Sequence, residues 1–343
     1  MLTVKLGKTN ITVNKDAFGV LPLQRRNMDD AVAILRRALD SGINYFDTAR
    51  AYTDSEEKIG NALAARRREF FLATKTTATT ADGFWKDLET SLRLLKTDYI
   101  DVYQFHNPEF CPKPNGADGL YDAALEAKKQ GKIRHIGITN HRLLIAKEAA
   151  QSGLYDTLQF PFCYLSGEKE IELVELCKKN NVGFIAMKAL SGGLLHDIDA
   201  ARAWLVQFDN VVPIWGIQHE HELTELLDAA KSGSTELSAA QKQKIEADRK
   251  ELAGNFCRSC GYCLPCPADI KIFNCARMML LLKRMPSEQW LTPAWQQEMA
   301  KIPNCKNCAH CKKNCPYGLD PPALLKQHYE GYQKYLKEKG ITA

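Results

Sequence analysis

"DYIDVYQFH", residues 98–106, is one of a series of short, mostly apolar runs that decide the fold of this 343-residue chain. Each run is rich in Ile, Val and Phe and has the length of a strand buried on both faces of a parallel sheet. The others are NYFDT, EFFLATK, IRHIGITN, TLQFPF, VGFIAMKA and NVVPIWGI, which begin at residues 44, 69, 133, 157, 182 and 210, and FGV near residue 19.

Amphipathic stretches separate these runs. DDAVAILRRALDSG, residues 29–42, opens with acidic residues and closes with glycine, which is typical of a helix. Eight alternating strand–helix units of this length predict an α/β fold, a (β/α)8 TIM barrel, over residues 1–235. A doubly wound open sheet is the alternative, but no G-x-G-x-x-G follows the first strand.

Polar residues recur where the predicted strands end. Asp47, Lys75, His106 and Asn140 are separated by 28, 31 and 34 residues, which is one strand–helix unit each. Tyr52 follows Asp47 in the next loop. Taken singly, such residues are often a helix cap, a packed tyrosine or a core histidine. Because strand ends meet at one mouth of a TIM barrel, we expect these side chains to converge there as an acid–base site.

The chemistry of this group suits carbonyl reduction. A phenol with a pKa near 10 is a poor acid at neutral pH. An ammonium about 4 Å away contributes roughly 4 kcal/mol at an effective dielectric of about 20, on the order of three pKa units before desolvation. We therefore predict that Tyr52 donates the proton, that Asp47 holds Lys75 in place, and that His106 orients the substrate carbonyl.

Four segments resemble the signatures of the aldo-keto reductase family: GINYFDTARAYTDSEEKIGNAL, FFLATKT, DYIDVYQFHNP and IRHIGITNH, which begin at residues 42, 70, 98 and 133. The resemblance extends over residues 1 to about 230. It implies a barrel, NAD(P)H as cofactor, and the catalytic tetrad Asp47, Tyr52, Lys75 and His106. It further implies cofactor contacts at strand ends and in the loop LSGGLL, residues 190–195: Thr139, Asn140, Gln159, Met187, Lys188, Ser191, Gly192, Gly193 and Gly216.

Two positions depart from the family pattern. Met187 stands where the family usually stacks an aromatic residue on the nicotinamide. After the eighth strand, GIQHEHELTEL supplies Glu220 and Glu222 where many NADPH-preferring members carry basic residues. A 2′-phosphate would meet carboxylates there, so the sequence predicts no strong preference for NADP over NAD.

Eight of the 12 cysteines form two tight runs near the C-terminus. The second run is Cys305, Cys308, Cys311 and Cys315, with Pro316 after it, and fits the bacterial ferredoxin spacing C-x2-C-x2-C-x3-C-P. The first run is Cys257, Cys260, Cys263 and Cys266, with a last gap one residue shorter. We predict two [4Fe-4S] clusters that exchange their fourth ligands. One would be held by Cys257, Cys260, Cys263 and Cys315, the other by Cys305, Cys308, Cys311 and Cys266. Structural zinc sites are the alternative.

The cysteine runs belong to a predicted second domain, residues 236–343, formed by a linker helix and a small helical dicluster ferredoxin-like module. Ser238 and Gln241 are spaced for a capping box at the start of the linker helix. Residues 268–286 have a helical pattern, and PPALLKQHYEGYQKYLKEKG, residues 321–340, is a helix opened by proline. A subset of aldo-keto reductases resembles this chain in carrying such a tail. The isolated Cys111, Cys163 and Cys177 are expected to be buried small hydrophobes.

Composition and charge limit the classes of partner that we expect for this protein. No run reaches the roughly 18 apolar residues of a membrane span, and the first residues lack the apolar core of a signal peptide. We expect a cytoplasmic protein with no membrane contact. From residue 251 onward there are 13 Lys and Arg against 7 Asp and Glu, but no nucleic-acid motif accompanies this basic balance.

Three hypotheses follow from the combination of a hydride site with one-electron clusters. The first is nicotinamide-dependent reduction of an aldehyde or ketone, or the reverse alcohol oxidation, with a tail that serves structure, docking or redox sensing. The second is a reductase fed by a ferredoxin or flavodoxin partner through the clusters, without nicotinamide. The third, a non-enzymatic electron carrier or scaffold, is disfavoured by the intact tetrad.

Overall fold

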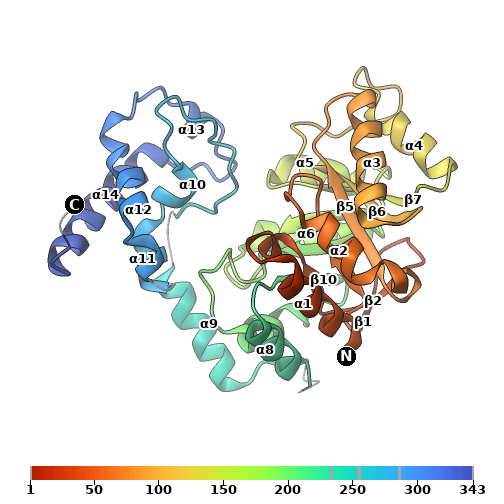
Figure 1. Cartoon of the computed structure of the whole chain (residues 1–343), viewed down its shortest axis with the longest axis horizontal. Coiled ribbons are helices and arrows are strands. Elements are labelled where there is room, and N and C mark those ends of the chain that lie inside the picture. The colour runs from red at the N-terminus through yellow and green to blue at the C-terminus, as the bar shows by residue number, and fades with distance from the viewer. Residues whose placement is uncertain (1, 232–234, 253–255, 285–286, 342–343) are drawn as a thin grey trace. The chain divides into compact units, whose positions relative to one another are not determined.

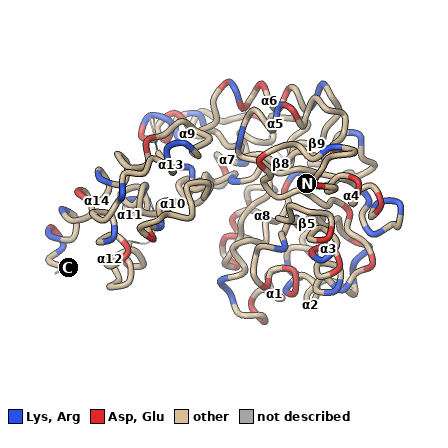
Figure 2. Tube along the Cα trace, turned by 90° about the horizontal axis from the view of Figure 1, so that it is seen from above, with Lys and Arg blue, Asp and Glu red and all other residues tan. Residues whose placement is uncertain are grey.

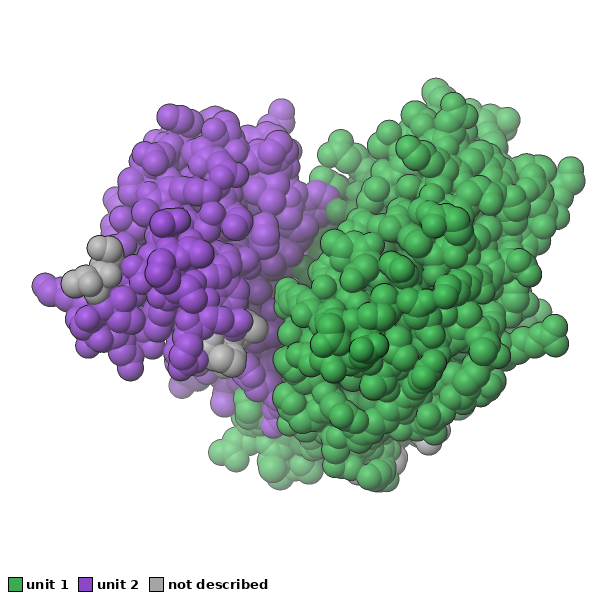
Figure 3. Space-filling view, in the orientation of Figure 1, with its two compact units in different colours: residues 1–189, 198–245 green, residues 190–197, 246–343 purple. Residues whose placement is uncertain are grey.

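The computed structural model describes residues 2–231, 235–252, 256–284 and 287–341, and the chain forms two compact units (Figure 3). The barrel unit comprises Met1–Ala189 and Ile198–Ile245, and the cysteine unit comprises Leu190–Asp197 and Glu246–Ala343. Residues 236–245, which we had assigned to the linker, group with the barrel. The loop 190–197 groups with the cysteine unit, although both of its ends continue into the barrel.

Parallel strands close the barrel in the order β10-β3-β4-β5-β6-β7-β8-β9, so each strand lies beside its neighbour in sequence (Figure 1). All eight predicted strands are present, and the predicted (β/α)8 barrel is confirmed. Their bounds are β3 (Ala17–Gly19), β4 (Tyr45–Asp47), β5 (Phe71–Thr76), β6 (Ile100–His106), β7 (Ile133–Thr139), β8 (Thr157–Pro161), β9 (Gly183–Met187) and β10 (Val211–Gly216).

Helices surround the barrel and carry interspersed acidic and basic residues (Figure 2). In α1, Asn27 caps the first turn by accepting a hydrogen bond from the Asp30 amide at 2.8 Å, and Ile34 and Leu35 face the core. Within the described residues, no helix combines the length and apolar character that crossing a membrane requires. The helix bounds are α1 (Met28–Asp40), α2 (Ser55–Leu63), α3 (Ala81–Leu95), α4 (Leu120–Lys129), α5 (Leu143–Gln151), α6 (Glu168–Lys179), α7 (Ile198–Leu205) and α8 (Glu220–Lys231).

An antiparallel hairpin precedes the barrel and was not predicted. Its strands are β1 (Thr3–Lys5) and β2 (Thr12–Asn14). Val4 and Val13 of the hairpin pack with Tyr45 and other inward-facing residues at the starts of the barrel strands. The hairpin therefore covers apolar side chains at the amino end of the barrel and leaves its carboxyl end for chemistry.

The cysteine unit has a hydrophobic core of its own, which includes Ile272, Met299 and Leu325. Its helices are α10 (Ile272–Cys275), α11 (Met278–Arg284), α12 (Pro293–Ala300), α13 (His310–Lys313) and α14 (Pro321–Glu338), with short 3-10 turns η3 (Ser287–Trp290) and η4 (Ile302–Asn304). The predicted proline-opened helix is confirmed as α14, where Asp320 caps the Ala323 amide at 3.3 Å.

The helix α9 (Ala239–Glu251) starts in the barrel unit and continues into the cysteine unit. Its predicted capping box is confirmed. The Gln241 side chain accepts from the Ser238 amide at 2.8 Å, and the Ser238 hydroxyl accepts from the Gln241 amide at 3.2 Å. The three isolated barrel cysteines are buried, as expected: Cys111, Cys163 and Cys177.

Candidate active site and candidate cluster sites

A buried ion pair lies at the carboxyl ends of two adjacent strands. Asp47 ends β4, and Lys75 lies one residue before the end of β5. The Lys75 ammonium is 2.6 Å from Asp47 Oδ1 and also donates to the Thr48 carbonyl at 2.6 Å. Both side chains are at most 2% exposed. Since a buried charge is costly unless it is paired and hydrogen-bonded, each of the two residues requires the other.

Two amide side chains surround the same carboxylate. Gln104 donates to Asp47 Oδ2 at 3.2 Å, and Gln159 donates to Asp47 Oδ1 at 3.4 Å. Burial raises the pKa of Asp47, while the Lys75 charge and these donors oppose the rise. Gln104 was not among the residues predicted for the site. Its signal was available, because it lies two residues before His106 on β6 and therefore faces the same side of the strand.

Tyr52 and His106 lie beside the ion pair and are more exposed than it. The Lys75 ammonium is 5.3 Å from the centre of the Tyr52 ring, and the Tyr52 and His106 rings meet edge to face at 5.7 Å. Both rings are half-buried. The structure therefore brings the four predicted tetrad residues together, with the charged pair inside and the phenol and imidazole toward the rim.

The pKa of Tyr52 departs from the expectation. We expected the Lys75 charge to lower it, but burial raises the pKa of the phenol, the Lys75 charge only partly reverses this, and Asp47 adds to the rise. Desolvation of the phenolate outweighs one nearby ammonium that is itself neutralised by a carboxylate. The phenol thus keeps its proton at neutral pH, as a proton donor must.

His106 is a neutral imidazole at physiological pH. Burial, followed by the Lys75 charge, lowers the pKa of His106 to about 3. Its Nδ1 atom is buried and has no hydrogen-bond partner among the described residues. A neutral imidazole donates one hydrogen bond without adding a charge, which suits the orientation of a carbonyl oxygen.

A second buried carboxylate fixes the loop that carries Tyr52. Glu56 is 1% exposed, forms an ion pair with Arg50, and accepts hydrogen bonds from the hydroxyls of Thr74 and Ser91 at 2.7 Å each. The Arg50 amide in turn donates to the Lys75 carbonyl at 3.0 Å. Sequence reasoning missed Glu56, because it belongs to the charged run DSEEK, which has the appearance of a solvated helix face.

Of the residues predicted to hold the nicotinamide carboxamide, Thr139 ends β7, Asn140 follows it, and Gln159 lies in the middle of β8. Thr139, Asn140 and Gln159 are all buried. The side-chain amide of Asn140 is already hydrogen-bonded to the backbone. It donates to the Pro108 carbonyl and accepts from the backbone N–H of Arg142, both at 2.8 Å. Gln159 Oε1 has no partner among the described residues and is the acceptor that remains available. Met187 lies 3.9 Å from the Thr139 hydroxyl.

The predicted pyrophosphate loop follows β9 and has an unusual backbone. Lys188, Ser191, Gly192 and Gly193 have φ angles of 58°, 51°, 65° and 89°. Successive backbone amides in a turn can form an anion-binding concavity, and here the Gly193 amide already donates to the Leu190 carbonyl at 3.0 Å. Ser191, Gly192 and Gly193 belong to the cysteine unit, whereas the other predicted cofactor residues belong to the barrel unit.

β10 is followed by the N-terminus of α8, where the Glu222 carboxylate accepts backbone hydrogen bonds. Glu222 accepts hydrogen bonds from the backbone amides of Gln218 and His219 at 2.6 and 2.8 Å. Gly216 ends β10, and a Cβ added there would lie 3.2 Å from Pro22. Amides at a helix N-terminus are natural phosphate ligands. Here Glu222 takes two of them.

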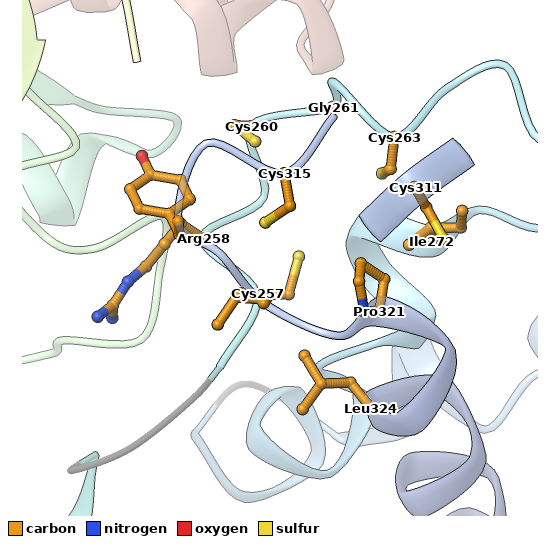
Figure 4. A pocket seen from close by; sticks show the side chains of 12 residues that line it. Cys257, Arg258, Cys260, Gly261, Cys263, Ile272, Cys311, Cys315, Pro321 and Leu324 are labelled. Atoms are coloured by element: carbon orange, nitrogen blue, oxygen red, sulfur yellow. The ribbon is translucent and has the colours of Figure 1, made fainter. Parts of the chain in front are cut away.

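The eight clustered cysteines line two cavities in the cysteine unit. Figure 4 shows the first cavity, where Cys257, Cys260 and Cys263 meet Cys315 from a segment far along the chain. Cys311 also reaches this cavity. The second cavity is lined by three cysteines of the second run, Cys305, Cys308 and Cys311, and by two of the first, Cys263 and Cys266. Cys315 lines the first cavity and Cys266 the second, which is the grouping that two clusters with exchanged fourth ligands would require.

The thiols surround space and do not converge on a point. Among the described residues, no three His, Cys, Asp or Glu side chains are close enough to hold a single metal ion. Burial raises the pKa of the Cys263 thiol to about 12, so its thiolate requires a strongly attracting partner. A cluster of several iron atoms fits a cavity ringed by spaced thiols, and the residues present therefore fit this group.

The fold and the site together define a barrel oxidoreductase with an added cysteine-rich unit. The chain belongs to the aldo/keto reductase family, whose model matches residues 17–203. A second model, described as a 4Fe-4S dicluster domain, matches residues 256–320. The protein is therefore an oxidoreductase acting on carbonyl or alcohol groups. Its family uses NAD(P)H, and its second domain indicates iron–sulfur clusters.

Known proteins are similar in sequence to part of this chain. An uncharacterized oxidoreductase, YqkF, of Bacillus subtilis is 28% identical over 69% of this chain and 80% of its own length. L-galactose dehydrogenase of Arabidopsis thaliana is 31% identical over 56% of this chain and 66% of its own. Methylglyoxal reductase DkgB of Salmonella typhi is 34% identical over 39% and 51%. The chain thus spans between half and four fifths of these relatives.

Solved structures show the same fold. The aldo-keto reductase AKR11C1 from Bacillus halodurans, in its holo form, superposes with a TM-score of 0.64 at 24% identity. The match covers 72% of this chain and 96% of that one. At this identity the likeness establishes the barrel fold alone.

Proposed function

We propose that the protein reduces an aldehyde or ketone with a hydride from nicotinamide, or runs the reverse oxidation, with Tyr52 as the proton donor. The observation that carries this proposal is the half-buried phenol of Tyr52 beside the buried Lys75–Asp47 pair and the neutral His106. The substrate is a small carbonyl or alcohol, and the setting we propose is the cytoplasm.

Each tetrad residue has a separate task. His106 and Tyr52 hydrogen-bond the carbonyl oxygen and polarise the carbon. A bound nicotinamide supplies the hydride. As negative charge develops on the oxygen, the proton moves from Tyr52 Oη to that oxygen, and the Lys75 ammonium stabilises the resulting phenolate. Asp47, held by Gln104 and Gln159, keeps Lys75 in position.

For the dinucleotide we propose the residues at the ends of β7, β8, β9 and β10. Gln159, with its free acceptor, and Thr139 suit a carboxamide, and Met187 and Lys188 lie after them along the rim of the barrel. The loop amides of Ser191 and Gly192 suit a pyrophosphate, and Gly193, whose amide donates to the Leu190 carbonyl at 3.0 Å, allows close approach of the backbone. Because Glu222 occupies the amides at the start of α8, we propose that NAD is used at least as well as NADP.

For the cysteine unit we propose two [4Fe-4S] clusters with exchanged fourth ligands. If this is correct, Cys315→Ser perturbs the cluster of the first run, Cys257, Cys260 and Cys263, and leaves the other intact. Cys266→Ser does the reverse. Iron analysis near eight atoms per chain in the wild type, with electron paramagnetic resonance of each variant, checks the assignment. A control, Cys275→Ser, alters a buried cysteine that lines neither cavity and should keep both signals. Stoichiometric zinc would contradict the clusters.

One observation favours the second candidate function, a supply of single electrons through the clusters. Cys308 lines the second cavity and is the exposed member of the eight clustered cysteines. Lys306, His310 and Lys313 around it are exposed as well, and no Asp or Glu occurs between Glu298 and Asp320. An exposed cluster edge with a basic rim suits an acidic donor such as a ferredoxin or flavodoxin.

One experiment separates the two candidates. Anaerobic protein is given 4-nitrobenzaldehyde or methylglyoxal with NADH, NADPH or a reduced acidic ferredoxin as the sole electron source. We expect alcohol formation with NADH, and at most equal rates with NADPH. Turnover with ferredoxin alone would support the second candidate. The double variant Lys306→Glu, Lys313→Glu should then slow this ferredoxin-driven turnover. In that case Lys337→Glu, an exposed charge on α14, is the matched control.

A further inference from the structure

Arg277 is a buried cation that the proposed reaction does not use. It lies between α10 and α11 of the cysteine unit, is 5% exposed, and donates one hydrogen bond at 3.1 Å to the Gly192 carbonyl. Gly192 lies in the loop 190–197, which belongs to the same unit. A residue of the cysteine unit therefore contacts the loop that we propose for the pyrophosphate.

The rest of the guanidinium has no partner among the described residues. Its Nε and Nη1 atoms are buried without a hydrogen bond, and no carboxylate pairs with the side chain there. A buried, uncompensated charge is strongly unfavourable in a folded protein. A diffusible phosphate cannot explain the arrangement, because these atoms have almost no accessible surface. The compensating charge has to come from inside the unit.

A source of negative charge inside this unit is the first cysteine run. The Cys257 sulfur lies 3.9 Å from the Phe273 carbonyl, one helical turn before Arg277, and Ile272 of the same segment lines the first cavity. Burial lowers the pKa of the Arg277 guanidinium, and a negative charge on Cys257 opposes that fall. A cubane with four thiolate ligands carries a net negative charge, so a cluster in this cavity supplies what the guanidinium lacks.

We propose that Arg277 is a positioning residue that links the first cluster to the loop 190–197: the cluster neutralises its guanidinium, and the guanidinium holds the Gly192 carbonyl. This extends the proposed function, since the loop is the candidate pyrophosphate site. The redox state of the cluster then tunes the affinity for the dinucleotide. By reciprocity, the dinucleotide also shifts the potential of the cluster.

The first test compares Arg277→Gln with the wild type in the full, cluster-loaded chain. A positive charge near a cluster stabilises its reduced, more negative form, so the variant should have a lower reduction potential in a titration followed by electron paramagnetic resonance. Hydrogen exchange should become faster at the amides of Gly193 and Leu195, which are bonded to the Leu190 carbonyl. Arg277→Lys, which keeps the charge, should restore most of the potential.

The matched control is Lys271→Gln, which removes the same charge from the exposed start of the same segment. It should leave the loop exchange unchanged. An unchanged potential in Arg277→Gln would overturn the charge link, and a shifted potential with unchanged loop exchange would overturn the loop link.

The wild type provides a test that does not depend on any variant folding. Loop exchange and the Kd for NADH are measured with oxidised and with dithionite-reduced clusters. We expect hydrogen exchange in the loop to be slower with reduced than with oxidised clusters. The Kd for NADH should differ between the two states by at least about fivefold, the lower end of typical allosteric coupling. Equal loop exchange in the two states would refute the link. If NADH does not bind in either state, the proposed function fails, while loop exchange still decides the role of Arg277.

Discussion

Tyr52→Phe is expected to lower carbonyl turnover at least about 100-fold, and as much as 10⁴-fold, because it removes only the transferable proton. The ring contacts with His106 and Lys75 do not involve the hydroxyl and should remain. The measurement is the steady-state rate with NADH and 4-nitrobenzaldehyde under anaerobic conditions. The iron content and cluster absorbance should not change, because Tyr52 belongs to the barrel unit and the cysteines to the other.

A matched substitution is available on the strand that precedes Tyr52. Tyr45 begins β4, is fully buried at the amino end of the barrel, and has a hydroxyl without a partner among the described residues. Tyr45→Phe should leave turnover near the wild-type rate. If Tyr52→Phe turns over as fast as Tyr45→Phe, then Tyr52 is not the proton donor.

Lys75→Met is expected to abolish turnover and also to destabilise the barrel. The substitution leaves Asp47, which is 2% exposed, without its cation. Removing one partner of a buried ion pair costs about 3–5 kcal/mol of unfolding free energy. The measurement is chemical denaturation followed by circular dichroism, beside the same turnover assay. A variant as stable as the wild type would show that the ion pair is not formed as described.

The same variant should respond to pH in a defined direction. Burial raises the pKa of Asp47, and Lys75 opposes that rise, so removing the lysine raises the pKa further. A carboxyl group whose pKa is higher in the folded than in the unfolded state stabilises the protein at low pH and less as pH rises through the folded value. The stability loss should therefore be smaller at pH 5 than at pH 8.

A buried lysine at the opposite end of the barrel controls for loss of buried charge alone. Lys15 precedes β3, is 4% exposed, and donates to the Val206 carbonyl at 2.9 Å. Lys15→Met should destabilise the barrel but retain turnover by the folded protein. If Lys15→Met and Lys75→Met lose turnover to the same extent, then Lys75 acts only through the stability of the barrel.

The strand pattern predicted the fold because continuous apolar runs separated by amphipathic segments leave few closed arrangements. The sequence pattern did not reveal the hairpin β1–β2, whose three-residue strands are too short to show a period. The tetrad could be located from strand ends, but the direction of the Tyr52 pKa could not. That direction depends on the depth of burial, which spacing along the chain does not report.

The supporting residues were harder to predict than the reactive ones. Glu56 and Gln104 carry side chains that are common on surfaces, and only the folded barrel shows that both are buried. Arg277 was one basic residue in a helical stretch. Its role depends on the contact with Gly192, which lies 85 residues earlier in the chain, and no local pattern encodes such a non-local contact.

The most direct measurement of the central claim follows the hydride itself. NADH carrying deuterium at both C4 positions is supplied with 4-nitrobenzaldehyde, and the alcohol is examined by mass spectrometry and proton resonance. The account predicts one deuterium on the carbinol carbon of every product molecule. Tyr52→Phe should form this labelled alcohol only at its low residual rate. Alcohol formed without deuterium on that carbon would contradict hydride transfer at the tetrad.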